Sequence, residues 1–188
     1  SPAGGKAGVG KLSSSGAAAK DFGTAGFLEL PVQGQWLAVD GTGRMFVPCL
    51  RGQVQVRDAA GRSLGTLNAA GTTGGAVGPN GRFYVRTGYG KGMQAFAADA
   101  TGDAKALVTE ENVPGAEMKF YMAPMVGLYA GPSVAAGPGG RLYLSDGHVP
   151  GSSRGTISRY QDNGTAIERL YYYRRCLKDC IGVAVDGR

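Results

Sequence analysis

The chain has 188 residues, of which 43% are hydrophobic and 18% are charged, and its net charge is +6. This composition excludes a disordered chain, because disordered segments contain too few apolar residues to form a core. The sequence has no run of about 18 consecutive apolar residues, so it predicts no membrane-spanning helix. The 34 glycines lie between β-branched and aromatic runs, a distribution that indicates many short strands joined by tight turns.

The first 21 residues are small, polar and basic, and they predict a flexible N-terminal arm. Within this arm, the segment GKAGVGKLS at 5–13 approaches the phosphate-binding pattern G-x4-G-K-[ST]. However, Leu12 occupies the position that requires a magnesium-binding hydroxyl, and no strand pattern precedes the segment. The segment is therefore interpreted as a basic linker and not as a nucleotide site.

Beyond the arm, the sequence repeats one form three times. An apolar strand leads to a turn with a Gly-Arg pair and then to an apolar-aromatic strand, at 37–47, 75–85 and 134–144. A further strand, a turn containing Asp and Gly, and a last strand follow, at 53–67, 93–107 and 156–170. Asp and Gly suit these turns because they tolerate the backbone conformations that tight hairpins need. One unit is therefore predicted to be four short strands in two hairpins.

Four antiparallel strands in about 40 to 45 residues, repeated along the chain, are the pattern of β-propeller blades. The predicted fold is all-β, with blades at 22–73, 74–132 and 133–180 and the start of a further blade at 181–188. The second unit carries an insertion at about 109–131 that is rich in Met, Phe and Tyr. We expect this insertion to fold over the propeller edge or to contact a partner.

Three blades do not close a ring, since closed propellers have about four to eight. Strand edges and apolar blade faces would then remain uncovered, which is an aggregation hazard. The sequence therefore predicts that these blades are an incomplete propeller. Further propeller blades or another protein subunit are the expected partners that complete the ring.

The segment FGTAGFLELPVQGQWLAVDGTGRMFV at 22–47 resembles an NHL repeat, which typically has F-G, a further Gly, a Pro, an apolar-V-D-G turn and an apolar-Y-V strand. The resemblance covers 22–70 well and 75–107 and 134–170 moderately. Gly78 and Gly137 stand where the family has the Asp that this chain keeps at Asp40 and Asp186. The resemblance implies a propeller, but NHL-like propellers include scaffolds, RNA binders, lactonases and lyases, so it does not fix the function.

The loops that follow the aromatic strands are predicted to carry the binding surface. They lie at 48–52, 86–92 and 145–155, and equivalent loops of a propeller gather at one end of its channel. The candidate ligand-binding residues in them are Arg51, Arg86, Tyr89, Asp146, His148 and Arg154. We expect a non-enzymatic interaction module that binds protein or carbohydrate through these loops.

Two alternatives to this interpretation stay open. One is a metal-assisted lactonase or lyase of the NHL-like type, and the other is an RNA-binding propeller. His148 is the only histidine, and one histidine cannot form a multi-histidine zinc site. No cofactor is therefore predicted, although a site for Ca²⁺ or another divalent metal built from carboxylates stays open. The basic and aromatic segment 168–178 is more typical of a strand with solvated arginines than of a nucleic-acid surface.

The cysteines do not identify a compartment. Cys176 and Cys180 are spaced C-x3-C, which is not a zinc or redox motif, and Cys49 is separate. A local disulfide and buried reduced thiols are both consistent with this spacing. No signal peptide is visible, but a processed chain would show none, so a secreted or periplasmic location is only slightly preferred.

Overall fold

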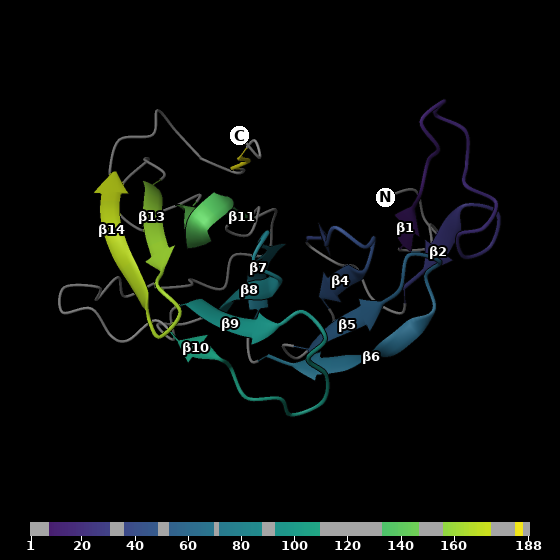
Figure 1. Cartoon of the computed structure of the whole chain (residues 1–188). Helices are drawn as coiled ribbons and strands as arrows, with labels where there is room; N and C mark the ends of the chain where they lie inside the picture. The colour runs from purple at the N-terminus through teal and green to yellow at the C-terminus, as the bar shows by residue number, and fades with distance from the viewer. Residues whose placement is uncertain are drawn as a thin grey trace, which may run out of the picture.

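The computed structural model describes residues 8–30, 36–48, 53–69, 72–87, 93–109, 133–146, 156–173 and 183–185. Within these ranges the chain consists of strands and turns, with one short 3₁₀ helix, η2 (Pro138–Gly140). Three four-stranded antiparallel sheets follow one another along the chain (Figure 1). They correspond to the three units predicted from the sequence.

In each sheet the strands lie side by side in sequence order. The first sheet contains β3 (Ala38–Val39), β4 (Met45–Pro48), β5 (Gln53–Arg57) and β6 (Ser63–Asn68). The second contains β7 (Thr72–Val77), β8 (Arg82–Thr87), β9 (Met93–Ala97) and β10 (Val108–Thr109). The third contains β11 (Ser133–Ala136), β12 (Arg141–Asp146), β13 (Thr156–Asp162) and β14 (Ile167–Tyr173). Each sheet is therefore a simple meander.

Aspartates at the start of two turns explain why the first sheet folds locally as it does. The Asp40 carboxylate accepts hydrogen bonds at 2.9 Å from the backbone N–H groups of Thr42 and Arg44. The Asp58 carboxylate accepts equivalent bonds from Ala60 at 3.0 Å and Arg62 at 2.9 Å. Such Asx turns satisfy backbone donors that the tight reversal would otherwise leave unpaired.

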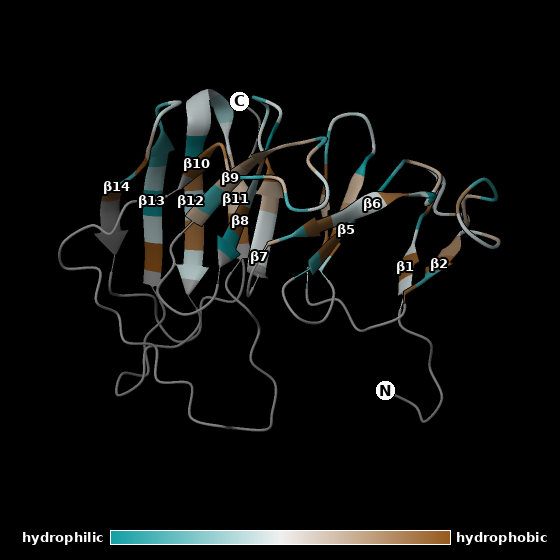
Figure 2. Cartoon of the chain, turned by 90° about the horizontal axis from the view of Figure 1, so that it is seen from below, coloured by the Kyte–Doolittle hydropathy of each residue, from teal (hydrophilic) through white to brown (hydrophobic). Residues whose placement is uncertain are grey.

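The sheets pack face to face through alternate residues of their strands. Phe46 of β4 stacks on Phe83 of β8, with ring centroids 4.3 Å apart, in the core between the first and second sheets. Tyr84, the neighbour of Phe83, points the other way, into the core between the second and third sheets. Because successive side chains of a strand point to opposite faces, each sheet contributes to both of its neighbours. Apolar positions concentrate on the strands of the three sheets (Figure 2).

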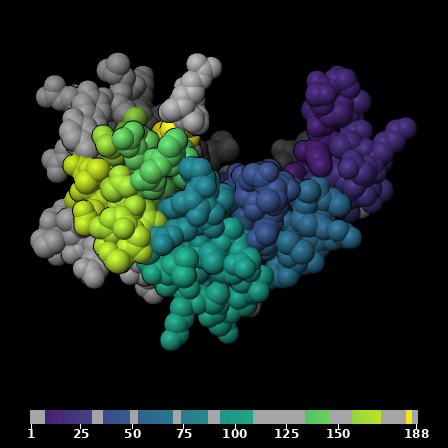
Figure 3. Space-filling model, viewed as in Figure 1, coloured from purple at the N-terminus to yellow at the C-terminus, as the bar shows by residue number. Residues whose placement is uncertain are grey.

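The three sheets also touch along their first and last strands. β7 lies beside β3 and β11, so the first strands of the three sheets are neighbours. At the outer edge, the Asn68 N–H donates to the Gly102 carbonyl at 2.9 Å, and the Gly102 N–H donates to the Thr66 carbonyl at 2.5 Å. The turn after β9 is thus fastened to β6. Figure 3 shows the sheets side by side in chain order.

The N-terminal segment differs from the flexible arm that its composition predicts. β1 (Gly8–Gly10) pairs with β2 (Phe27–Glu29) in a separate two-stranded sheet. Phe22 is fully buried and packs with Met45 and Val47 on the face of the first sheet turned away from the second. Leu30, Val9, Ala19 and Leu28 join this apolar cluster, and their burial with the Phe22 ring explains why the segment is ordered. Residues 1–7 of the predicted arm lie outside the described ranges.

Residues 183–185, predicted to begin a further blade, lie beside the third sheet. A Cβ atom built on Gly137, in the turn before β12, would be 3.1 Å from Val185 Cγ1. A Cβ atom on Gly78, the equivalent glycine one sheet earlier, would be 3.6 Å from the Ala136 Cβ of β11. Val185 therefore lies against the turn of the third sheet as Ala136 of β11 lies against the turn of the second. The insertion at 109–131, apart from Thr109, lies outside the described ranges.

Candidate functional site

A buried charged cluster joins the second and third sheets. Arg82 Nη1 donates to both carboxylate oxygens of Asp162, at 2.8 and 2.7 Å, and Tyr84 Oη donates to Asp162 Oδ2 at 2.7 Å. The Gly164 N–H donates to Asp162 Oδ1 at 2.8 Å, and Asn80 Nδ2 donates to Tyr84 Oη at 2.6 Å. Every polar group of the cluster thus has a partner, which is the condition for a stable buried network.

The cluster shifts the pKa values of two of its members. Burial alone would raise the pKa of Asp162, but hydrogen bonds from Tyr84, Gly164 and Arg82 and the Arg82 charge outweigh it and hold this pKa below its ordinary value. Burial and the adjacent Asp162 carboxylate raise the pKa of Tyr84 to about 12. Asp162 is therefore ionised and Tyr84 neutral at pH 7. Both groups are held in these states by contacts between the sheets.

A similar arginine contact joins the first and second sheets. Arg44 Nη1 donates to the Ala98 carbonyl at 2.6 Å, and Ala98 lies directly after β9. In both contacts, the arginine after the first turn of one sheet reaches the outer turn, between the third and fourth strands, of the next sheet. Both kinds of turn lie at the same end of an antiparallel meander. The first and outer turns of all three sheets therefore lie at the same end of the molecule.

This common orientation defines two ends. The turn end carries the first and outer turns of every sheet. The loop end carries the connections between second and third strands, because β4, β8 and β12 all finish there. Arg86 and Asp146, two of the predicted binding residues, lie in the last two positions of β8 and β12, so their backbones share the loop end.

The other predicted binding residues, Arg51, Tyr89, His148 and Arg154, lie outside the described ranges, as does the side chain of Asp146. The Arg86 side chain is half-buried and makes interactions of its own. The gathering of the six side chains into one surface stays a prediction. In the part of the chain that the structure describes, no group of three or more His, Cys, Asp or Glu residues is placed to hold a metal ion.

The comparisons with solved structures concern the fold. A chain of the mitotic checkpoint complex crystal structure matches with a TM-score of 0.56 and 15% identity, over 85% of this chain and 45% of that one. The chain forms β-propeller blades. A gluconolactonase from Xanthomonas campestris matches with a TM-score of 0.42 and 17% identity, over 72% of this chain and 46% of that one. The chain thus spans less than half the length of either structure.

The sequence comparisons add nothing to this assignment. No family model matches the chain, and no curated protein matches it. The three sheets are henceforth called the first, second and third blade.

None of the helices in the described residues is long and apolar enough to cross a membrane.

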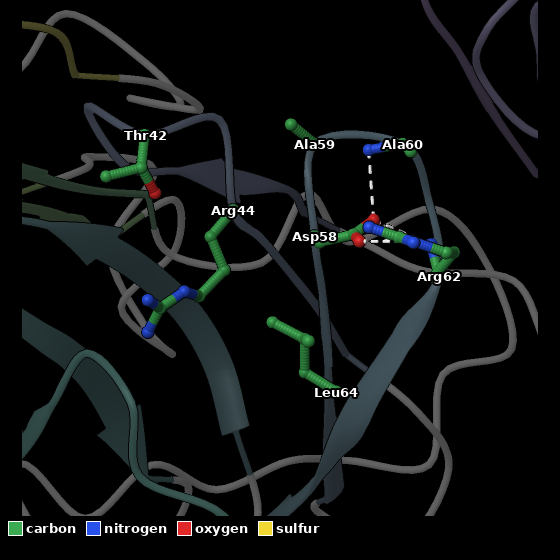
Figure 4. Close-up of a pocket in the computed structure, with 7 residues that line it drawn as sticks. All are labelled: Thr42, Arg44, Asp58, Ala59, Ala60, Arg62 and Leu64. Atoms are coloured by element: carbon green, nitrogen blue, oxygen red, sulfur yellow. Dashed lines mark hydrogen bonds and ion pairs between the residues drawn. The ribbon is translucent and has the colours of Figure 1, made fainter.

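The first blade contains a hollow that the sequence does not predict. It has a volume of about 330 Å³ and lies at the turn end (Figure 4). Its lining residues come from the two turns and from β6: Thr42, Arg44, Asp58, Ala59, Ala60, Arg62 and Leu64. The only sequence signal for it is the pair of short turns, each with an arginine directly after a glycine.

The charged groups of this hollow are committed to the turns that form it. Arg62 Nε lies 2.6 Å from Asp58 Oδ2, while the Arg62 side chain is 83% exposed. Partial burial would raise the pKa of Asp58, but bonds from the Arg62 backbone and guanidinium and from the Ala60 N–H outweigh it and hold this pKa below its ordinary value. Arg44 is already bound to Ala98. The charged groups of the hollow therefore stabilise its two turns and the contact with the second blade.

Proposed function

We propose that the chain supplies blades of an NHL-like propeller that acts as a non-enzymatic interaction module. In this proposal a protein or a carbohydrate binds at the loop end, in contact with Arg51, Arg86, Tyr89, Asp146, His148 and Arg154. The observation that carries the proposal is the common orientation of the blades. Because Arg44 and Arg82 bind the outer turns of the following blades, the second-to-third-strand connections of all three blades leave from one side.

The hydrogen bonding of polar groups supports a ligand site at the loop end and not at the turn end. At the turn end, Asp58 and Asp162 are saturated by hydrogen bonds within and between blades. Toward the loop end, Trp36 Nε1 and Ser145 Oγ are buried and have no hydrogen-bond partner among the described residues. Trp36 precedes β3, and Ser145 is the residue before the last of β12. Unpaired buried polar groups are costly, and a ligand that supplies acceptors at this end would relieve that cost.

The proposal is tested by probing a glycan array and a displayed peptide library with the labelled chain. Binding that depends on the loop end is expected to be lost in Arg86→Ala, Tyr89→Ala and His148→Ala. The matched control is Arg62→Ala, which removes an exposed arginine from the turn end and is expected to leave binding unchanged. Binding lost in the control and kept in the loop-end variants would contradict the proposal, as would the absence of any glycan or peptide ligand.

The same preparation separates the two alternative functions. Hydrolysis of a lactone that requires an added divalent metal would favour a lactonase. Binding of single-stranded RNA that weakens steeply with salt would favour an RNA-binding propeller, because counterion release makes such binding salt-dependent. Either result would replace the interaction module as the proposed function.

A further inference from the structure

The arginine after the first turn occurs once in each blade, and two of the three copies bind the next blade. Arg44 of the first blade donates to the Ala98 carbonyl of the second. Arg82 of the second blade binds Asp162 of the third, in a pair whose side chains are 23% and 1% exposed. Both acceptors lie in the outer turn of the following blade. The same arginine contact thus joins the first blade to the second and the second blade to the third.

Arg141 is the copy of this arginine in the third blade, and it lacks such a partner. Its side chain is exposed and makes no hydrogen bond or ion pair with another described residue. By strand alternation it lies with Tyr143 on the face of β12 turned away from the second blade, since Leu142 and Leu144 pack in the core between these two blades. The equivalent aromatic residues, Phe46 and Tyr84, both contact the next blade.

A second unpaired group lies on the same face. Arg159 of β13 is directly opposite Tyr143 in the antiparallel register, and cross-strand partners share a face of the sheet. Its Nε atom is buried and has no hydrogen-bond partner in the part of the chain that the structure describes. This face of the third blade therefore combines two arginines and a tyrosine. Its positive charge complements a carboxylate or a main-chain carbonyl.

We propose that this face binds a further propeller blade, whose first strand begins at Val183–Val185 and whose outer turn accepts hydrogen bonds from Arg141. The position of Val185 against Gly137, equivalent to that of Ala136 against Gly78, places the first strand of such a blade. The acceptor is an aspartate carboxylate or a carbonyl, as at Asp162 and Ala98. The interface continues the one already formed twice in the chain.

A second copy of this chain, docked through its first blade, does not fit this role. The corresponding face of the first blade is covered by the N-terminal segment, with Phe22 packed on Met45 and Val47. The outer turn of that blade is also occupied, because Lys11 Nζ donates to the Ala59 carbonyl at 3.1 Å and the Gly23 N–H donates to the Ala60 carbonyl at 3.3 Å. The occupant is therefore a blade distinct from these three.

The proposal is tested by appending the strands of such a blade to the chain. In one extended chain, residues 140–173 are repeated directly after Arg188, so that a copy of the Asp162 turn is available to Arg141. In a second, residues 81–109 are repeated there, which supplies a copy of the Ala98 turn. The rate at which phenylglyoxal modifies Arg141 is then measured by peptide mass spectrometry in native buffer, for the extended and the original chains.

We expect at least one extension to slow the modification of Arg141 about tenfold, the factor that corresponds to 1.4 kcal/mol. Arg62 and Arg82 are the internal standards, fast and slow respectively in every chain. In the first extension, Asp162→Ala in the appended copy alone is expected to restore the modification rate. Arg141 modified equally fast in both extended chains would overturn the proposal, and protection that survives the appended Asp162→Ala would overturn the assigned contact.

Discussion

Asp162→Ala tests the contact between the second and third blades. The substitution removes the acceptor of three groups, Arg82 Nη1, Tyr84 Oη and the Gly164 N–H. Breaking a buried ion pair by removal of one partner typically costs about 3 to 5 kcal/mol, because the other charge is left without compensation. Arg82 keeps 23% of its side-chain surface exposed, so water reaches the guanidinium that has lost its partner. We therefore expect a loss near the lower bound, about 3 kcal/mol.

The free energy of unfolding is measured by urea titration. Trp36 is the only tryptophan and lies 6.0 Å from Phe83, between ring centroids, so its fluorescence reports on the packing of the first two blades. Circular dichroism follows all strands. The matched control is Asp58→Ala, which removes the equivalent turn aspartate of the first blade, whose partner Arg62 is 83% exposed. The control is expected to lose much less stability, since exposed ion pairs contribute little.

Two results would refute the reasoning. One is a loss below about 1 kcal/mol for Asp162→Ala, the value of a single ordinary hydrogen bond. The other is an equal loss in the Asp58→Ala control. Either would show that the buried cluster does not join the blades in the way its geometry indicates.

The pKa shifts and the turn glycines give further predictions. Because the pKa of Asp162 is lowered on folding, its contribution is complete above the unfolded value near 3.8 and is lost as the pH falls further; Asp162→Asn should flatten the acid limb of a melting-temperature profile. The pKa of Tyr84 is raised to about 12, so its contribution is lost between about pH 10 and 12, and a Tyr84→Phe variant that kept the wild-type alkaline limb would contradict this. Gly139 and Gly140 both have positive φ angles, of 67° and 77°, but a Cβ on Gly140 would clash with the Asp162 carbonyl, whereas one on Gly139 meets open space. Gly140→Ala should therefore lower the melting temperature further than Gly139→Ala, which itself costs about 1 to 2 kcal/mol.

The local parts of the fold are predictable from the sequence. The Asp and Gly residues of the turns act within a few positions, as at Asp40 and Asp58, so the four-stranded units and their order follow from the repeat. The β-propeller architecture follows from the same spacing. The order of the N-terminal segment does not, because it depends on the packing of Phe22 and its apolar neighbours against Met45 and Val47 of the first blade, and the composition of residues 1–21 does not indicate that contact.

The contacts between blades also could not be predicted. Arg82 and Asp162 are 80 positions apart, and their pairing depends on how two complete sheets pack. The equivalence of Arg44, Arg82 and Arg141 is visible in the repeat, but their role appears only when the outer turn of the next blade is placed beside them. For the binding surface, the sequence places its loops after β4, β8 and β12, and the common orientation of the blades is consistent with one shared end. The contribution of Arg51, Tyr89, His148 and Arg154 stays a prediction.

The central claim is that the three sheets are successive blades, packed face to face and fastened in one orientation. Solution NMR tests it most directly, through contacts that exist only between blades. We predict cross-peaks between the rings of Phe46 and Phe83, which stack at 4.3 Å, and slow amide exchange at Asn68 and Gly102, whose N–H groups bridge the first and second blades. Intact sheets without these ring contacts, and with both amides exchanging as fast as free turns, would contradict the account.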